Sequence, residues 1–121
     1  MAIGTITINA RAEDTNGCLK LFKCSFDGDD DYATGGTEDV QAALRTAIET
    51  AAGSATDANV RGIEQVTIVD VIPGDCGQYV PSWDYANSKL KVRDGGHATW
   101  DEVANTTDLS GTTFNVTFIT K

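Results

Sequence analysis

Residues 112–120 have the sequence TTFNVTFIT, in which apolar side chains recur at every second position. In an extended chain, side chains two residues apart lie on the same face, so Phe114, Val116 and Phe118 share one face of a predicted strand. The polar residues between them belong to the other face. This pattern favours a sheet with one buried side, and therefore a protein built mainly from β strands.

Five further stretches upstream have the composition of strands. Residues 66–72 are β-branched and nearly continuous, which is typical of a central strand covered on both faces. Asn16 and Gly17 separate two alternating stretches and favour a tight hairpin turn, because both residues adopt positive φ readily. The alternation slips at Leu21 and Phe22, which indicates a β-bulge or a strand covered on both faces. In chain order, the predicted strands lie at residues 3–10, 19–26, 66–72, 79–85, 89–92 and 112–120.

One amphipathic helix is predicted at about residues 38–52. Its apolar residues recur with helical spacing and form one stripe: Val40, Ala43, Leu44, Ala47, Ile48 and Ala51. Thr37 is expected to cap the helix, and Glu38 and Asp39 suit the positive end of its dipole.

These elements predict a single β-rich domain that spans residues 1–121. A chain of this length can bury one core. Short strands separated by turn residues are typical of an antiparallel β-sandwich or jelly-roll-like domain. The helix is expected to pack across an open edge or end of that domain.

The charge balance excludes several classes of partner. The chain has 18 acidic and 9 basic residues and a formal charge of −9. This excess repels phosphate groups, so neither nucleic acid nor an anionic membrane is an expected partner. A secretory signal is not expected, nor is an apolar stretch of about 18 residues that could span a membrane. We therefore expect a protein that is made in the cytosol.

Few residues could form a catalytic centre. His97 is the only histidine, and no nucleophile elbow, phosphate-binding loop or dinucleotide-binding glycine motif is present. The odd number of cysteines (Cys18, Cys24 and Cys76) argues against a disulfide framework and favours reduced, partly buried thiols. We expect no enzyme and no cofactor, and the substitution His97→Ala should abolish no activity.

The large aromatic residues have two interpretations. Trp83, Trp100, Tyr32, Tyr79 and Tyr85 could stack on sugars or on a protein partner. Aromatic rings more often fill the core of a β domain, where they bury a large area.

An acidic loop provides the one candidate metal site. Asp27, Asp29 and Asp31 have the spacing of the first calcium ligands of an EF-hand, and Glu38 falls at the twelfth position. Two features argue against a true EF-hand: Tyr32 occupies the position that requires glycine, and the preceding segment is a predicted strand. A solvated acidic loop is the alternative interpretation.

Three stretches carry a resemblance to a known family: residues 32–36 (YATGG), 79–92 (YVPSWDYANSKLKV) and 107–118 (TDLSGTTFNVTF). Together they resemble the small virion structural proteins of tailed bacteriophages, especially head decoration or cement proteins. The resemblance covers roughly residues 26–121.

The resemblance implies a function and a set of partners. Such proteins bind the outer surface of the capsid, reinforce the joints between major capsid subunits, are often sandwich or jelly-roll domains, and in several cases are trimers. It implies a virion protein assembled in the host cytoplasm, with the major capsid protein as partner and no catalytic residues. Residues 1–12 are strand-like rather than an obvious capsid-gripping arm, so the mode of attachment stays open.

Two other classes of function remain as alternatives. One is a carbohydrate- or receptor-binding β-sandwich of a phage tail or fibre, which an exposed tryptophan in a groove would favour. The other is a calcium-dependent binding module built on the acidic loop.

Overall fold

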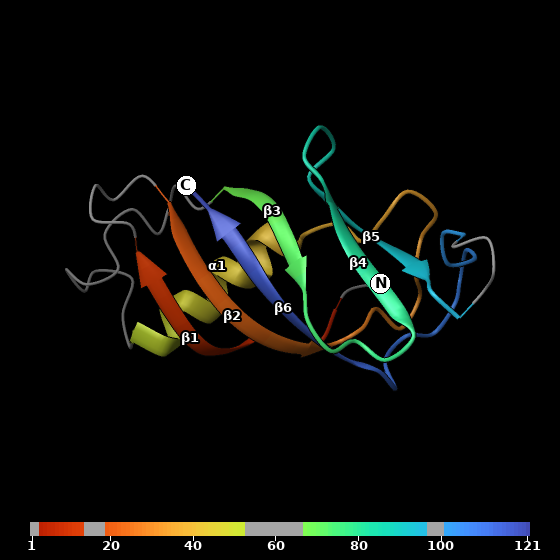
Figure 1. The fold of residues 1–121 in the computed structure, drawn as a ribbon, viewed down its shortest axis with the longest axis horizontal. Coiled ribbons are helices and arrows are strands. Elements are labelled where there is room, and N and C mark those ends of the chain that lie inside the picture. Colours follow the sequence, from red (N-terminus) through yellow and green to blue (C-terminus); the bar gives the residue numbers. More distant parts are fainter. Residues whose placement is uncertain (1–2, 14–18, 53–66, 97–100) are drawn as a thin grey trace.

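The computed structural model describes residues 3–13, 19–52, 67–96 and 101–121 (Figure 1). Within these ranges, strands and one helix follow each other in the predicted order. They are β1 (Thr7–Glu13), β2 (Lys20–Asp27), α1 (Val40–Ala52), β3 (Ile68–Pro73), β4 (Tyr79–Asp84), β5 (Lys89–Asp94) and β6 (Thr113–Thr120). The prediction of a mainly β protein with antiparallel sheets and one helix is confirmed.

Four strands form an antiparallel sheet in the order β1-β2-β6-β3, and β4 and β5 pair in a separate two-stranded sheet. β6 is internal, because it pairs with β2 on one side and with β3 on the other. The prediction that residues 66–72 form a central strand is wrong, since β3 is an edge strand of the larger sheet. Its apolar composition reflects packing instead, because Ile68 and Val71 are buried in the core.

β1 and β2 pair as the sequence predicts, although the turn at residues 16–17 lies outside the described ranges. The bulge is in β1, between Ile8 and Ala10, and not at Leu21 and Phe22. β2 instead alternates regularly, with Phe22 buried and Leu21 exposed. The slip in the sequence therefore marks a strand with apolar residues on both faces.

The helix covers the inner face of the four-stranded sheet, behind the strands in Figure 1. Val40, Leu44 and Ile48 from the predicted stripe are buried there. They belong to one core cluster with the inward side chains of β2 and β6, which are Phe22, Cys24, Phe26, Phe114, Val116 and Phe118. The prediction that the helix packs across an open edge or end of the domain is therefore wrong. Its apolar stripe is instead buried against the apolar face of the sheet. Across the described residues, no helix has the length and hydropathy needed to cross a membrane.

The helix begins two residues later than a cap at Thr37 would allow. Thr37 pairs with Leu90 in an isolated β-bridge, and its hydroxyl donates to Asp29 Oδ2 at 2.9 Å. The first helical bond runs from the Ala43 N–H to the carbonyl of Asp39, which has a φ of 62°. The prediction that Thr37 caps α1 is therefore wrong, because both its backbone and its side chain have other partners.

Stacked aromatic rings connect the sheet to the hairpin. The ring of Phe26 lies 5.7 Å from that of Phe114 and 6.1 Å from that of Phe118. Tyr79 of β4 stacks on the other side, with its centroid 6.2 Å from that of Phe114. Each such pair contributes about 0.5–1.5 kcal/mol beyond the area that it buries. The alternating residues of β6 thus hold the two sheets together.

We expect Phe118→Ala to lower the free energy of unfolding by about 3–5 kcal/mol, because Phe118 is fully buried in the middle of the core. Urea denaturation followed by circular dichroism would measure the loss. Thr117→Ala, the matched change at the next residue on the opposite face, should cost about 1 kcal/mol or less. Equal losses for the two variants would contradict this account of β6.

Candidate functional site

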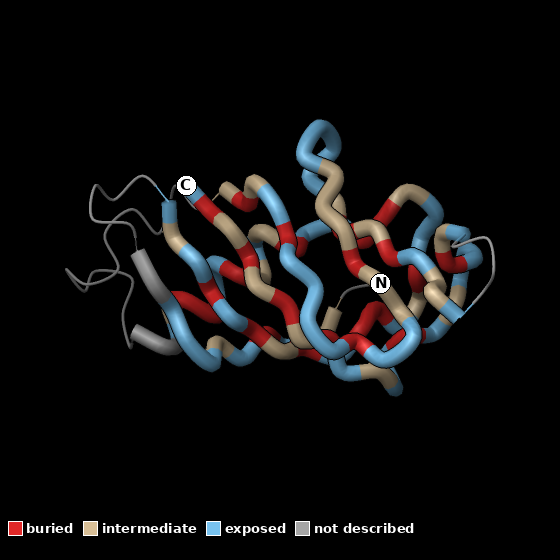
Figure 2. The backbone as a smooth tube through the Cα atoms, viewed as in Figure 1, coloured by how far each residue is buried: buried red, intermediate tan, exposed pale blue. Residues whose placement is uncertain are grey.

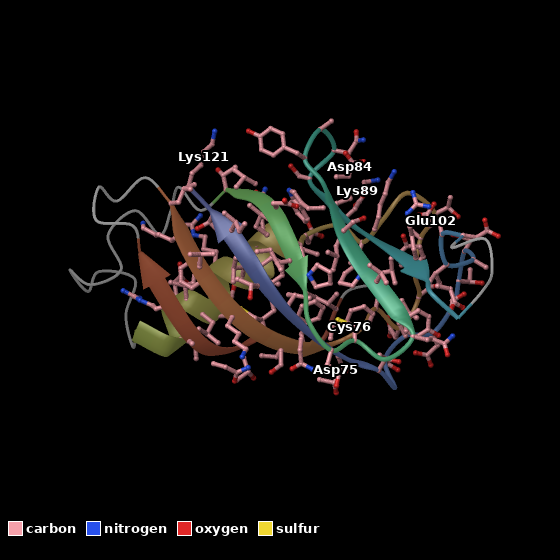
Figure 3. The ribbon with its side chains drawn as sticks, in the orientation of Figure 1. Asp75, Cys76, Asp84, Lys89, Glu102 and Lys121 are labelled. Carbon is pink, nitrogen blue, oxygen red and sulfur yellow. The ribbon has the colours of Figure 1, made fainter. Side chains whose placement is uncertain are left out.

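Tyr32 anchors the loop between β2 and α1. Its side chain is fully buried, and its hydroxyl donates to Glu102 Oε2 at 2.7 Å. The same hydroxyl accepts the backbone N–H of Val92 at 3.0 Å, and the Gly35 N–H donates to Glu102 Oε2 at 2.8 Å. One phenol and one carboxylate therefore connect the loop, β5 and the segment that follows β5, where Figure 3 labels Glu102.

The protonation states of this pair follow from its surroundings. Burial, and then the hydrogen bond to Glu102, raise the pKa of Tyr32 above its usual range, so the phenol stays neutral. Partial burial raises the pKa of Glu102, but the hydrogen bonds from Tyr32 and Gly35 outweigh it and leave the pKa below the usual value. The pair is a neutral donor and a charged acceptor, which is a stable structural arrangement and not a nucleophile with a base.

Backbone hydrogen bonds complete the same unit. The Tyr32 N–H donates to the Thr107 carbonyl at 3.0 Å, and the Leu109 N–H donates to the Asp29 carbonyl at 2.7 Å. Gly36 has a φ of 120°, and a Cβ there would lie 2.9 Å from the Cβ of Lys89. Only glycine fits at this close approach to β5. The three stretches that carry the family resemblance thus meet in one packed unit.

The four candidate calcium ligands have different partners. The buried Asp29 accepts the Asp31 N–H at 2.9 Å with one oxygen and the Thr37 hydroxyl with the other. The Asp27 carboxylate accepts the Thr113 hydroxyl, and Glu38 forms an ion pair of 3.4 Å with Lys89. In the described ranges, no group of three acidic, cysteine or histidine side chains converges on a point where it could hold a metal ion.

The other candidate chemical groups do not form a reacting centre among the described residues. His97, Trp100 and Cys18 lie outside those residues. Cys24 is buried and free, and burial raises the pKa of its thiol to about 12. Burial also raises the pKa of Cys76, which is free too. Both thiols are therefore protonated and poorly reactive at neutral pH.

The described aromatic residues mostly fill the core. Tyr32 is buried in the core, and Tyr79 and Trp83 are partly buried against it. The indole N–H of Trp83 is buried and has no hydrogen-bond acceptor among the described residues. Tyr85 is different, because it is 54% exposed in the turn between β4 and β5.

The face of the four-stranded sheet opposite α1, here called the open face, carries exposed hydrophobic side chains. Among the described residues, three of the four exposed large hydrophobic side chains lie on or beside this face: Leu19, Leu21 and Ile72, which are 43%, 37% and 49% exposed. Figure 2 shows that buried positions alternate with exposed or intermediate ones along β2 and with intermediate ones along most of β6. The slip at Leu21 and Phe22 was the sequence signal for this face, because it adds apolar residues on the solvent side.

Strand register places these side chains in two adjoining rows. Leu21 is opposite Ile119, which is opposite Asp70 on β3. In the next row, Lys23 is opposite Thr117, which is opposite Ile72. Lys23, Ile72 and Thr117 line a shallow hollow of about 330 Å³ on this face.

The charge of this face differs from that of the whole molecule. Its two rows carry one lysine and one aspartate, whereas the chain carries −9. Exposed hydrophobic side chains on a surface that carries no net charge favour contact with another protein. The open face is therefore the best candidate for a surface that docks on another protein.

Comparison of the chain with protein-family models, with curated proteins and with solved structures gives no match.

We expect Tyr32→Phe to lower the free energy of unfolding by about 1–3 kcal/mol, because it leaves the Val92 N–H without its acceptor and removes one of the donors to Glu102 Oε2. Thermal and urea unfolding would measure the change. Tyr85→Phe removes a hydroxyl from an exposed ring and should have almost no effect. Equal effects of the two substitutions would contradict an anchoring role for Tyr32.

The Glu102 contribution should depend on pH. The pKa of Glu102 is lower in the folded state than its ordinary value of 4.5, so its stabilisation is complete above that value. The stabilisation is lost as the pH falls through the folded-state pKa. The stability difference between the unmodified protein and Glu102→Gln should therefore be largest near neutral pH and shrink as the pH falls below 4.5 in urea titrations. A difference that does not change with pH would refute this assignment.

Proposed function

We propose that this chain is a structural virion protein that binds the outer surface of a phage capsid and stabilises it. The observation that carries the proposal is the open sheet face, on or beside which Leu19, Leu21 and Ile72 are exposed and whose two rows carry no net charge, in a molecule of charge −9. Such a face can contact a shell of protein subunits, while the acidic remainder stays in solvent. The major capsid protein is the proposed partner, and the exterior of the virion the proposed location.

The packed unit around Tyr32 supports the same proposal. The three stretches that resemble decoration proteins lie far apart in the sequence, but Tyr32 connects them: its N–H donates to the Thr107 carbonyl and its hydroxyl accepts the Val92 N–H. A likeness in three separate stretches is more informative when they build one structural unit. In this proposal, the four-stranded sheet and the β4–β5 hairpin form the layers of a small sandwich of jelly-roll type.

Assembly on a symmetric shell does not require a strong single contact. Several copies, with a trimer as the proposed state, would bind with an avidity that exceeds the affinity of each face. The Tyr32–Glu102 unit would provide rigidity, because a reinforcing protein must keep its docking surface in shape. This role needs neither a cofactor nor a reacting centre.

Tyr85 favours a second candidate function. Its exposed ring lies in the turn beside Asp84 and Asn87, whose side chains are hydrogen-bonded at 2.8 Å. An exposed aromatic ring beside fixed polar groups can bind a sugar, as in a carbohydrate-binding module of a phage tail or fibre. Glycan-array binding that disappears in Tyr85→Ala would favour this alternative over the capsid proposal.

The capsid proposal predicts that charges on the open face weaken binding. We expect Leu21→Glu and Ile72→Glu each to reduce the affinity for capsids of the cognate phage at least about tenfold, or ~1.4 kcal/mol. Each change replaces an exposed hydrophobic side chain by a carboxylate that would lose its hydration on binding. Co-sedimentation of labelled protein with capsids that lack it would measure the affinities.

Tyr85→Glu is the matched control, because it adds the same charge at an exposed hydrophobic residue outside the sheet. It should bind capsids as the unmodified protein does. Thermal unfolding would establish that all three variants remain folded. Absence of capsid binding by the unmodified protein, or equal binding by all variants, would overturn the proposal.

A further inference from the structure

We infer that the open face of the free protein pairs with the open face of a second copy of this chain, with Lys23 of each copy opposite Asp70 of the other. The inference stands on the residues of this face and goes beyond the proposed function, because it concerns the protein before it meets a capsid. Pairing would cover the docking surface, so a capsid would have to displace the second copy.

The two charged side chains in the two rows of the open face are of opposite sign. Lys23 and Asp70 are both exposed, and among the described residues Lys23 has no ion-pair partner. One oxygen of Asp70 accepts the Val71 N–H at 2.8 Å, which orients the carboxylate. Two strand spacings and two residues separate Lys23 from Asp70, or roughly 12 Å along the face. A face that carries the same two charges can supply a partner to both.

A two-fold axis brings these charges together across the pair. The axis lies between the two faces, at right angles to the line that joins Lys23 and Asp70, and passes over β6 midway between Thr117 and Ile119. It places each lysine over the aspartate of the other copy, so the interface contains two such contacts. Facing sheets pack about 10 Å apart, a distance that lysine and aspartate side chains together can bridge.

The same axis matches the exposed hydrophobic side chains. Leu21 of one copy falls between Leu21 and Ile119 of the other. Ile72 falls beside Thr117 of the other copy, over the hollow of about 330 Å³ that Thr117 lines. The face thus carries both an exposed isoleucine and the hollow that receives it, which is the self-complementarity that a two-fold interface requires. Together with the two charges, this match identifies a second copy as the occupant.

The charge of the whole molecule sets the conditions under which the copies pair. Each copy carries −9, and this charge opposes association at long range. At physiological ionic strength, interactions between exposed charges are screened beyond about 8 Å. The contact between two faces without net charge then decides whether the copies associate.

Sedimentation equilibrium of the full chain at that ionic strength, without capsids, tests the pairing. We expect an equilibrium between monomer and dimer. Lys23→Glu and Asp70→Lys should each weaken dimerisation at least about tenfold, because each change places two pairs of like charges in the two-fold interface. A chain that stays monomeric up to about 1 mM, or that forms trimers without dimers, would overturn the inference.

A mixture of the two variants tests which residues meet. In a pair formed by one Lys23→Glu copy and one Asp70→Lys copy, both charge contacts again join opposite signs. An equimolar mixture should therefore dimerise as the unmodified protein does, although neither variant does so alone. A defect in the folding of either variant could not be repaired in this way. A mixture that associates no better than the separate variants would overturn the inference.

Arg45→Glu is the matched control, because it changes the net charge by as much as Lys23→Glu does. Arg45 is exposed on α1, which lies on the other side of the sheet (Figure 1). This variant should dimerise as the unmodified protein does. Equal weakening by Arg45→Glu and Lys23→Glu would show that net charge governs association and would contradict the contact.

Ile72→Ala tests the apolar part of the interface. It should weaken dimerisation at least about tenfold, because it removes the side chain that fills the hollow of the other copy. Tyr85→Ala truncates an exposed hydrophobic residue outside the sheet and should have no effect. Equal dimerisation of the two variants would contradict the placement of Ile72.

The inference and the proposed function can fail independently. A protein that dimerises through Lys23 and Asp70 but does not sediment with capsids would overturn only the proposed function. A protein that sediments with capsids but is monomeric in their absence would overturn only the pairing of open faces.

Discussion

The double pairing of β6 is the constraint on which the other elements depend. β6 pairs with β2 over its whole length and with β3 on its other side, so the sheet is continuous only through this strand. Its inward phenylalanines stack on Phe26 and Tyr79 and so connect the sheet with the hairpin. α1 then covers what remains of the apolar face. Each of these contacts exists because apolar side chains recur at every second residue of β6.

Two parts of the molecule are stabilised by different interactions. The sheet and the helix are held together by the apolar core, and one face of the sheet is exposed in the part of the chain that the structure describes. The loop before α1, β5 and the segment after β5 are instead held by hydrogen bonds around Tyr32 and Glu102. A buried, fully paired polar group fixes geometry more strictly than apolar packing does, because it has few alternative arrangements. The second part therefore favours rigidity, and the first includes the face that we propose docks on another protein.

Sequence periodicity predicted which residues form the strands and the helix, but it predicted less well which elements lie next to one another. The β6 alternation and the helical stripe are local patterns, and both were confirmed. The position of β3 at an edge, the pairing of Thr37 with Leu90 and the bulge in β1 depend on residues far away in the chain. The acidic loop left two interpretations open for the same reason, since the spacing of Asp27, Asp29 and Asp31 does not show which way each carboxylate points. Only the break in the alternation of apolar and polar residues at Leu21 and Phe22 indicated the open face.

The register of β2 with β6 also has a kinetic consequence. Lys20 is opposite Thr120, so this pairing closes a loop of nearly the whole described chain. Pairings between residues so far apart form slowly, because the entropy of loop closure is lost before the contacts compensate for it. The β4–β5 hairpin joins neighbouring residues and can form early. The pairings of β2 and β3 with β6 form later. During that interval both strands have unpaired apolar edges, and newly made protein is then most prone to aggregate.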